Sequence, residues 1–203
     1  MMEFFDEFID FVAETMPSVS PYTVEGLKEC ISQFKFEYKK NCTTTMENEF
    51  SFLTQGDIID RIPFYRMNTN TGEMETSILQ GLVITNTCDC DRDENILIAP
   101  IVPIDKLTKK NKDTINDIKH NKVYGYMYIP DAPFENYVVD FSLINNYNRN
   151  FILKMIESGK INKIRSLNIY GFYLFICKIT IYLCRPEDKG VNEKRKEELL
   201  EKI

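Results

Sequence analysis

The chain has 203 residues, of which 43% are hydrophobic and 28% are charged, and its formal net charge is -6. This length and composition are typical of one soluble globular domain with terminal additions. The negative charge argues against a general DNA-binding surface, because neutralising phosphates requires clustered Lys and Arg. The sequence predicts neither a secretory signal nor a membrane span, and its six sparse cysteines favour reduced thiols in a cytoplasm.

Two amphipathic helices are predicted at the N-terminus. Apolar side chains recur at helical spacing over residues 2–16 and again over residues 24–38. Ser20 suits the N-cap of the second helix, and Pro21 suits its first helical position. Two helices with facing apolar seams and a short link predict an antiparallel helical hairpin over residues 1–45.

Residues 50–145 change to strand-like patterns that are separated by turns. Strands are predicted over 57–65, 77–87, 95–104, 122–129 and 137–141. Pro63 places the first of them at an edge or beside a bulge, and Gly81 indicates a bulge or bend in the second. Residues 105–120 are predicted as a helix or a loop. Several short strands with glycine bends predict a small, strongly bent antiparallel sheet or barrel.

Residues 146–203 return to helical patterns. One helix is predicted over 150–158 with Gly159 as its C-cap, and a longer one over 167–184. Ser166 suits the N-cap of the longer helix, which is apolar on most sides, so we expect it to be buried against the barrel or in a dimer interface. The predicted fold class is therefore α+β, a small bent antiparallel barrel flanked by an N-terminal helical hairpin and C-terminal helices.

Three segments carry a family resemblance. They are Gln55-Gly56-Asp57-Ile58-Ile59, Gly81-Leu82-Val83-Ile84-Thr85-Asn86 and Asn95-Ile96-Leu97-Ile98-Ala99-Pro100-Ile101. Their progression resembles the core of the MazF/PemK family of toxin endoribonucleases, which has an SH3-like barrel. A closer likeness is to an uncharacterised bacterial group, and it is carried by Leu82–Asp89, Leu97–Val102, Val138-Val139-Asp140 and Arg165. The resemblance implies an SH3-like barrel over residues 50–145 and a toxin–antitoxin or phage-defence setting.

The positions that correspond to the RNase residues of that family differ in this chain. Leu79-Gln80-Gly81 stands where the family has an Arg-Pro pair, and Val102 stands where it has Ser or Thr. We therefore expect a small cytoplasmic binding module whose partner is a protein or, through the terminal helices, a second copy. The alternative is a nuclease-like enzyme that acts on RNA through a carboxylate and arginine site. Its candidate catalytic residues are Cys88, Asp89, Asp140 and Arg165.

The corner Cys88-Asp89-Cys90-Asp91-Arg92-Asp93 allows several interpretations. Two thiolates could bind zinc with His120, or with Cys177 and Cys184. Asp89, Asp91 and Asp93 could form a calcium loop, although the turn glycine and the final glutamate of such a loop are missing. Cys88 could be a nucleophile, although the nearby carboxylates oppose its ionisation. We favour a structural corner in which Cys88 is buried and Asp89 caps the turn through its backbone, with no metal or other cofactor.

Three tyrosines alternate along the predicted strand 122–129. Tyr124, Tyr126 and Tyr128 would share one face of it, where they could stack nucleobases or pack across strands. We favour packing. Arg61 and Arg66 are further candidates for contacts with RNA or a protein partner.

Overall fold

The computed structural model describes residues 43–48, 50–107, 112–131, 133–184 and 194. The helices predicted over 2–16 and 24–38 lie outside the described residues. Within the described part, eight strands form one sheet in which every pair of neighbours is antiparallel. The strands are β1 (Thr45–Met46), β2 (Asp57–Met67), β3 (Met74–Val83), β4 (Asn95–Pro103), β5 (Tyr126–Tyr128), β6 (Tyr137–Asp140), β7 (Asn145–Asn148) and β8 (Lys163–Leu167).

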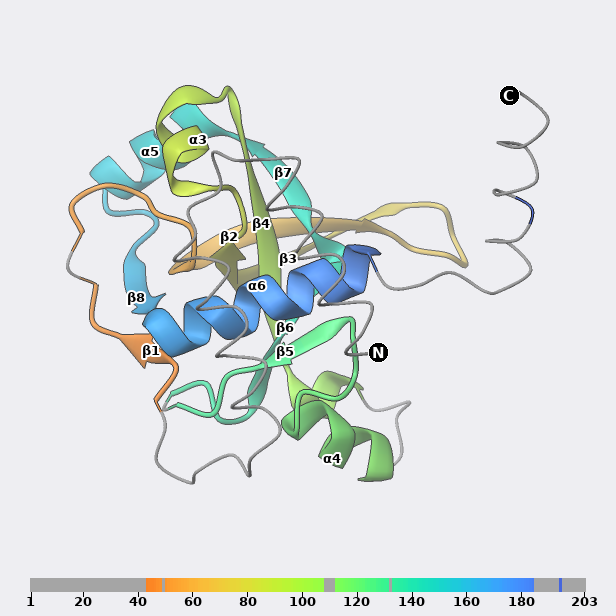
Figure 1. The fold of residues 1–203 in the computed structure, drawn as a ribbon. Helices are drawn as coiled ribbons and strands as arrows, with labels where there is room; N and C mark the ends of the chain where they lie inside the picture. The colour runs from red at the N-terminus through yellow and green to blue at the C-terminus, as the bar shows by residue number, and fades with distance from the viewer. Residues whose placement is uncertain (1–42, 49, 108–111, 132, 185–193, 195–203) are drawn as a thin grey trace, which may run out of the picture.

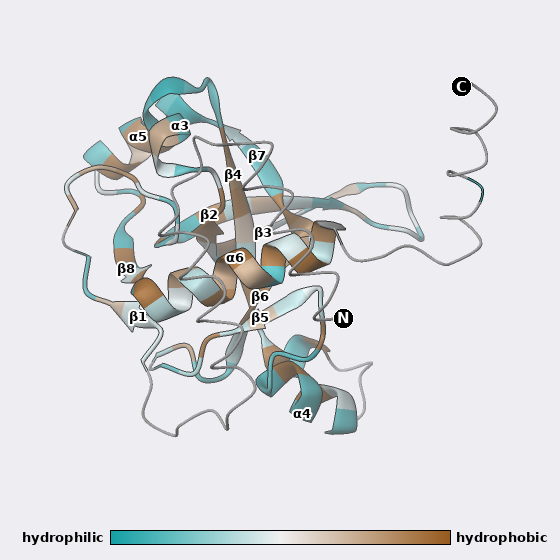
Figure 2. Cartoon of the chain, viewed as in Figure 1, coloured by the Kyte–Doolittle hydropathy of each residue, from teal (hydrophilic) through white to brown (hydrophobic). Residues whose placement is uncertain are grey.

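The helices lie on both faces and at both ends of this sheet. They are α3 (Thr87–Arg92), α4 (Lys112–Lys119), α5 (Arg149–Glu157) and α6 (Ile169–Cys184), with 3-10 turns η1 (Ile104–Leu107) and η2 (Phe141–Leu143). The apolar helix α6 crosses one face, α3 and α5 lie at one end, and α4 lies at the other (Figures 1 and 2). In the described part of the chain, no helix is long and apolar enough to cross a membrane.

Alternation along the strands divides the core into two layers. Ile58 and Leu82 face α6 and pack in one cluster with Phe175. Their sequence neighbours Ile59 and Val83 belong to a second cluster on the opposite face, which also contains Cys90 of α3 and Ile152 of α5. Successive strand residues point to opposite faces, so each buried strand supplies both layers.

The sheet is bent around β4. Its order is β1-β8-β2-β3-β4-β6-β5, while β7 pairs with β4 outside this path. Asn95–Ile98 pairs with β7 and Ile101–Pro103 pairs with β6, so the two strands follow each other along one edge of β4. The mixed α+β class is confirmed, but the observed sheet is open, with β1 and β5 at its edges, and the closed SH3-like barrel stays a prediction.

Several predicted boundaries are wrong. The strand expected over 77–87 begins at Met74 and ends at Val83, and α3 follows it. Of the strand expected over 122–129, only β5 is formed. Ser166 does not cap a helix, because it lies in β8. The N-terminal cap of α6 is Asn168, whose Oδ1 accepts the Gly171 N–H at 3.0 Å.

Short polar strands were missed by the sequence analysis. β1 lies at the junction between the predicted hairpin and the predicted strands, and β7 and β8 lie where the sequence favoured turns and helices. The region of residues 146–203 therefore supplies a strand to the sheet, because β8 pairs with both β1 and β2.

Gly81 is not a bulge. It lies opposite Ile59 in regular pairing, and the irregularity in β2 falls between Ile59 and Ile62, just before Pro63. A Cβ atom at Gly81 would stand 2.5 Å from Cγ2 of Ile98. The glycine therefore allows a close contact with a neighbouring side chain. The prediction for Pro63 is confirmed, because it follows a bulge in the strand.

Gly171 allows α6 to approach the backbone before β1, and we expect Gly171→Ala to destabilise the fold. A Cβ atom there would lie 2.0 Å from the Thr44 carbonyl oxygen, so the helix or the strand must move. The expected loss in the free energy of unfolding is about 1–3 kcal/mol, the usual cost of overpacking. Urea denaturation measures it.

Gly125→Ala is the matched control. Its new Cβ would meet only Tyr182, at 3.7 Å, which is an ordinary van der Waals distance. Equal losses in the two variants would contradict a specific role for the contact between α6 and Thr44.

Candidate functional site

The cysteine and aspartate corner is a short helix rather than a hairpin loop. Asn86 caps α3, and its Oδ1 accepts the Cys88 N–H at 3.0 Å. Cys88 and Asp89 are both exposed, so the expectation of a buried Cys88 is wrong. Asn86 caps the N-terminal end of α3, while the backbone carbonyl of Asp89 accepts the N–H of the C-cap residue Asp93 at 2.8 Å.

Cys90 is the buried thiol of this corner. Its Sγ lies 3.5 Å from the Thr85 carbonyl oxygen. Burial, assisted by the negative charges of Asp57, Asp89 and Asp93, raises the pKa of Cys90 to about 11. The thiol is therefore protonated at neutral pH, and Cys90 is neither a nucleophile nor a thiolate ligand in this state.

The four candidate catalytic residues lie in three separate places. Cys88 and Asp89 precede β4, whereas Asp140 ends β6 beside the far half of β4. Asp140 is buried and caps η2 by accepting the backbone N–H and the hydroxyl of Ser142. Arg165 lies in β8, which three strands separate from β6 in the sheet order, and its Nε donates to the Thr45 hydroxyl at 2.9 Å.

The metal-site interpretations gain no support from the arrangement of the described side chains. Among the residues that the structure describes, no three His, Cys, Asp or Glu side chains are grouped so that they could hold a metal ion. Cys88 and Cys90 therefore form no such group with His120 or Cys177, and the aspartates of α3 form none either. The side chain of Cys184 lies outside the described part.

The predicted tyrosine face is interrupted and partly buried. Tyr124 lies in the turn before β5, while Tyr126 and Tyr128 lie in the strand. The last two pack against a cluster that contains Ile118 of α4 and Val138 of β6. The Tyr128 hydroxyl donates to the Glu135 carbonyl at 2.9 Å, and burial raises its pKa. Packing accounts for these contacts.

Both candidate arginines have partners within the chain. Arg61 lies in the bulge of β2 with a φ of 53°, and its Nη2 donates to the Gly159 carbonyl at 3.1 Å. Its Nε lies 3.2 Å from Asp60. Arg66 lies farther along β2 and pairs with Glu75 of β3 at 2.8 Å. Both side chains are exposed, and they lie on different parts of the same strand.

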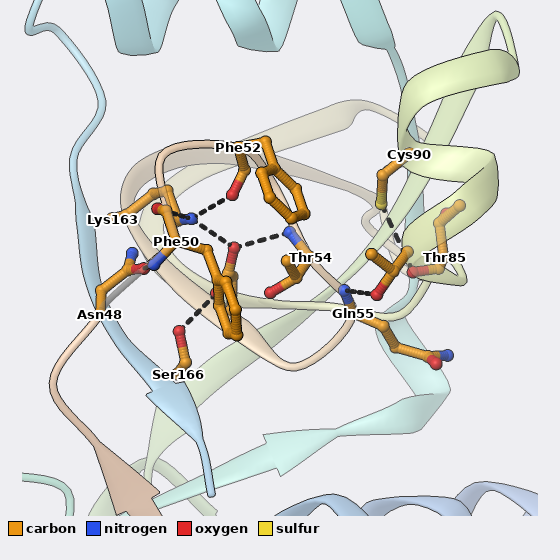
Figure 3. A network of polar contacts seen from close by, with 11 residues as sticks. Asn48, Phe50, Phe52, Thr54, Gln55, Thr85, Cys90, Lys163 and Ser166 are labelled. Carbon is orange, nitrogen blue, oxygen red and sulfur yellow. Dashed lines mark hydrogen bonds and ion pairs between the residues drawn. The ribbon is translucent and has the colours of Figure 1, made fainter.

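A buried ion pair that the sequence analysis missed lies where β2 meets β8. Asp57 is fully buried, and its Oδ2 lies 2.9 Å from Nζ of Lys163, whose side chain is 10% exposed. The Thr54 N–H donates to the same oxygen at 2.7 Å, and the Ser166 hydroxyl donates to the other. Figure 3 shows Lys163, Thr54 and Ser166 converging on this point.

The hydrogen-bonding capacity of this network is used within the protein. Lys163 also donates to the carbonyls of Phe50, at 2.9 Å, and Phe52. An ammonium has three donors, and Asp57 with these two carbonyls accounts for all of them. The network therefore fastens the segment before β2 to β8, and leaves Lys163 no free proton to donate to a substrate.

The outer part of the β2–β3 hairpin carries the largest group of exposed apolar side chains on one strand pair. We call residues 63–78 the arm; it projects from the rest of the described fold (Figure 1). Met67 lies opposite Met74, Tyr65 opposite Thr76, and Pro63 opposite Ile78, so these residues share one face. Its exposed apolar members, which we call the arm face, are Tyr65 (46%), Met67 (66%), Met74 (67%) and Ile78 (62%).

The arm is held in a defined orientation. On its other face, Phe64 is buried and its ring meets that of Tyr147 edge-on, with centroids 6.0 Å apart. The Tyr65 N–H donates to Oδ1 of Asn145 at 2.7 Å, and Nδ2 of Asn145 donates to the Tyr65 carbonyl. At the tip, Asn68 accepts the N–H groups of Asn70 and Thr71. The arm face is thus presented by an ordered hairpin.

The arm could have been found in the sequence, whereas the buried ion pair could not. A polar turn is flanked by apolar residues at alternating positions, with Tyr65 and Met67 before it and Met74 and Ile78 after it. This arrangement is typical of a hairpin with one apolar face. No local signal joins Asp57 to Lys163. Comparison with known proteins adds no assignment, because no family model and no curated protein matches the chain.

Proposed function

We propose that this chain is a protein-binding module built on an SH3-like barrel, and that the arm face is its docking surface. The observation that carries the proposal is a group of four exposed apolar side chains on one face of an ordered, projecting hairpin. Exposed apolar groups of this kind are typical of interaction sites, and Tyr and Met are enriched in protein interfaces. The family resemblance is the basis for proposing a bacterial toxin–antitoxin or phage-defence setting.

The curvature of the sheet supports the barrel. β3 and β4 separate β2 from β7 in the sheet, yet the Tyr147 hydroxyl of β7 donates to the Pro63 carbonyl of β2 at 3.0 Å. Asn145 of β7 bonds both backbone groups of Tyr65. A sheet in which two strands separated by two others approach in this way is strongly curved, and strong curvature is what a barrel requires.

A nuclease-like enzyme is the rival proposal, and the placement of its residues favours it less. Acid–base chemistry needs its groups within hydrogen-bond reach of one reacting centre. Asp89 and Asp140 lie beside opposite halves of β4, and Asp140 and Arg165 each bond to a different neighbour. No residue of the arm takes part in these contacts.

Substitution on the arm face, compared with substitution at the tip of the arm, tests the proposal. We expect Ile78→Glu to weaken retention of a protein partner at least tenfold, because an unpaired charge in an apolar contact costs more than about 1.4 kcal/mol. The measurement is quantitative isolation of the tagged full-length chain from the cells that produce it. Asn70→Glu is the matched control, since Asn70 is exposed at the tip of the same hairpin, outside both strands.

Two results would contradict the proposal. The first is identical retention of partners by Ile78→Glu and the wild type, with both folded by circular dichroism. The second is cleavage of single-stranded RNA by the purified chain that is lost in a folded Cys88→Ala/Asp89→Ala variant, which would establish the rival enzyme.

A further inference from the structure

The arm has a free strand edge as well as an apolar face. β3 pairs with β2 along the whole arm, but its pairing with β4 begins only at Gln80. Within the described part of the chain, no strand lies beside Met74–Leu79 on the side away from β2. An uncovered edge of this kind presents backbone groups that can pair with another strand.

The register shows which backbone groups face this edge. In antiparallel sheets, opposite residues alternate between pairs that bond to each other and pairs whose N–H and C=O point outward. Tyr65 directs both groups outward to Asn145, so Thr76, which lies opposite Tyr65, directs its own groups outward as well. By the same alternation, Met74 and Ile78 present their N–H and C=O at the free edge.

We propose that this edge pairs with the same edge of a second copy of the chain, around a two-fold axis at Thr76. The antiparallel register then places Met74 of one copy opposite Ile78 of the other, and the two Thr76 residues opposite each other. All three residues have outward-facing backbone groups, so each pair exchanges two hydrogen bonds. Thr–Thr and apolar pairs across strands are favourable.

The charges on the strand fit a second copy. The chain has a net charge of -6, so two copies repel each other, and a contact that brings few like charges together adds least to this repulsion. Ser77–Gly81 carries no charge, and the register places Glu75 opposite Ser77 of the other copy rather than opposite a second acid. Arg66 already neutralises Glu75 at 2.8 Å. The contact is isologous, so one self-complementary strand suffices to form it.

This inference rests on the proposed function, because edge pairing would join the two arm faces into one continuous apolar surface. Met74 and Ile78 belong to both the face and the edge, but each feature also has a residue of its own. Met67 contributes to the face and lies on β2, whereas Thr76 supplies backbone groups to the edge of β3. Variants at these two positions therefore separate partner binding from dimerisation.

Sedimentation velocity of the full chain at micromolar to tens of micromolar concentration tests the dimer. Thr76→Pro removes one edge N–H without removing a bond to β2, and we expect it to raise the dimer dissociation constant at least tenfold. Met67→Lys should leave the dimer intact. Met67 is almost as exposed as Met74, but it lies away from the edge. A wild-type monomer overturns the inference, as does a Thr76→Pro dimer of unchanged affinity, which would place the contact elsewhere, such as at the terminal helices.

A disulfide cross-link provides a second measurement in the folded protein. Opposite residues of a bonded antiparallel pair have Cα atoms about 5.5 Å apart, within the range of a disulfide. In a Cys88→Ser background, which removes an exposed thiol, Thr76→Cys should cross-link two copies on mild oxidation, whereas Thr71→Cys at the tip should not. Equal cross-linking at both positions, or none at Thr76→Cys, overturns the register. A wild-type monomer that still retains a partner would refute the dimer and leave the proposed function in place.

Discussion

Replacing Lys163 with methionine is expected to lower the free energy of unfolding by about 3–5 kcal/mol, the usual cost of removing one member of a buried ion pair. The reason is the position of Asp57, which is fully buried and lies 2.9 Å from the ammonium group. Methionine fills a similar volume but leaves the carboxylate uncompensated. It also removes the donor that the Phe50 and Phe52 carbonyls share. Chemical denaturation at neutral pH measures the loss.

Two companion variants make this measurement specific. Lys160→Met removes an exposed lysine from the segment before β8 and should change stability by less than about 0.5 kcal/mol. In the double variant Asp57→Asn/Lys163→Met the buried charge is absent, so its loss should be smaller than the sum of the single losses. Additive losses, or a Lys163→Met variant as stable as the Lys160→Met control, would show that the pair contributes little.

The ion pair also determines how the segment before β2 is presented. Lys163 bonds the backbone carbonyls of Phe50 and Phe52, whose exposed rings lie 5.7 Å apart. Asp57 bonds the Thr54 N–H of the same segment. Because the acceptors are backbone atoms, the position of this segment depends on Lys163 and not on the identity of the two phenylalanines. The network thus links the segment before β2 to β8, which lies far away in the sequence.

The strands that the sequence predicted well are those with strong apolar alternation. β2 and β4 were placed within a few residues, because Ile58 and Ile59, and later Ile98 and Ala99, supply opposite faces of a buried sheet. β7 has the sequence NNYN, and only Tyr147 in it is buried. Its place in the sheet depends on pairing with β4, which local sequence does not encode.

The same holds for the candidate site: the local sequence indicated some of its features, and others depend on contacts between distant residues. The sequence around Cys88 and Asp89 was chemically suggestive, but the fold places both residues on the exposed surface of a short helix. Asn86 supplies the cap, a role that its position before Thr87 could have indicated. Lys163 and Asp57 are more than a hundred residues apart, and only the pairing of β8 with β2 brings them together.

Lys178 is expected to make stability rise with pH above neutrality. It lies on α6, is 5% exposed, and donates from Nζ to the carbonyls of Asn121 at 2.9 Å and Val123 at 2.6 Å. Among the described residues, no carboxylate forms an ion pair with it. Burial lowers the pKa of Lys178 from 10.5 to about 8, because the charged form loses its hydration.

The direction of the effect follows from proton binding. Between pH 8 and 10.5, the unfolded chain carries a proton on this lysine and the folded chain does not. The free energy of unfolding therefore increases with pH in this window, by roughly 3 kcal/mol in total. Below pH 8 both states are protonated, so the folded state bears the full cost of the buried charge and the pH dependence from this group disappears.

Denaturation of the wild type and of Lys178→Met at pH 7, 8, 9 and 10 isolates this contribution. Other lysines and the tyrosines titrate in both proteins, so the difference between the two curves reports Lys178 alone. We expect the wild type to gain stability relative to Lys178→Met across this range, while Lys154→Met, which removes an exposed lysine of α5, runs parallel to the wild type. Parallel curves for Lys178→Met would mean that its two carbonyl partners offset the loss of hydration and keep the ammonium charged in the folded state.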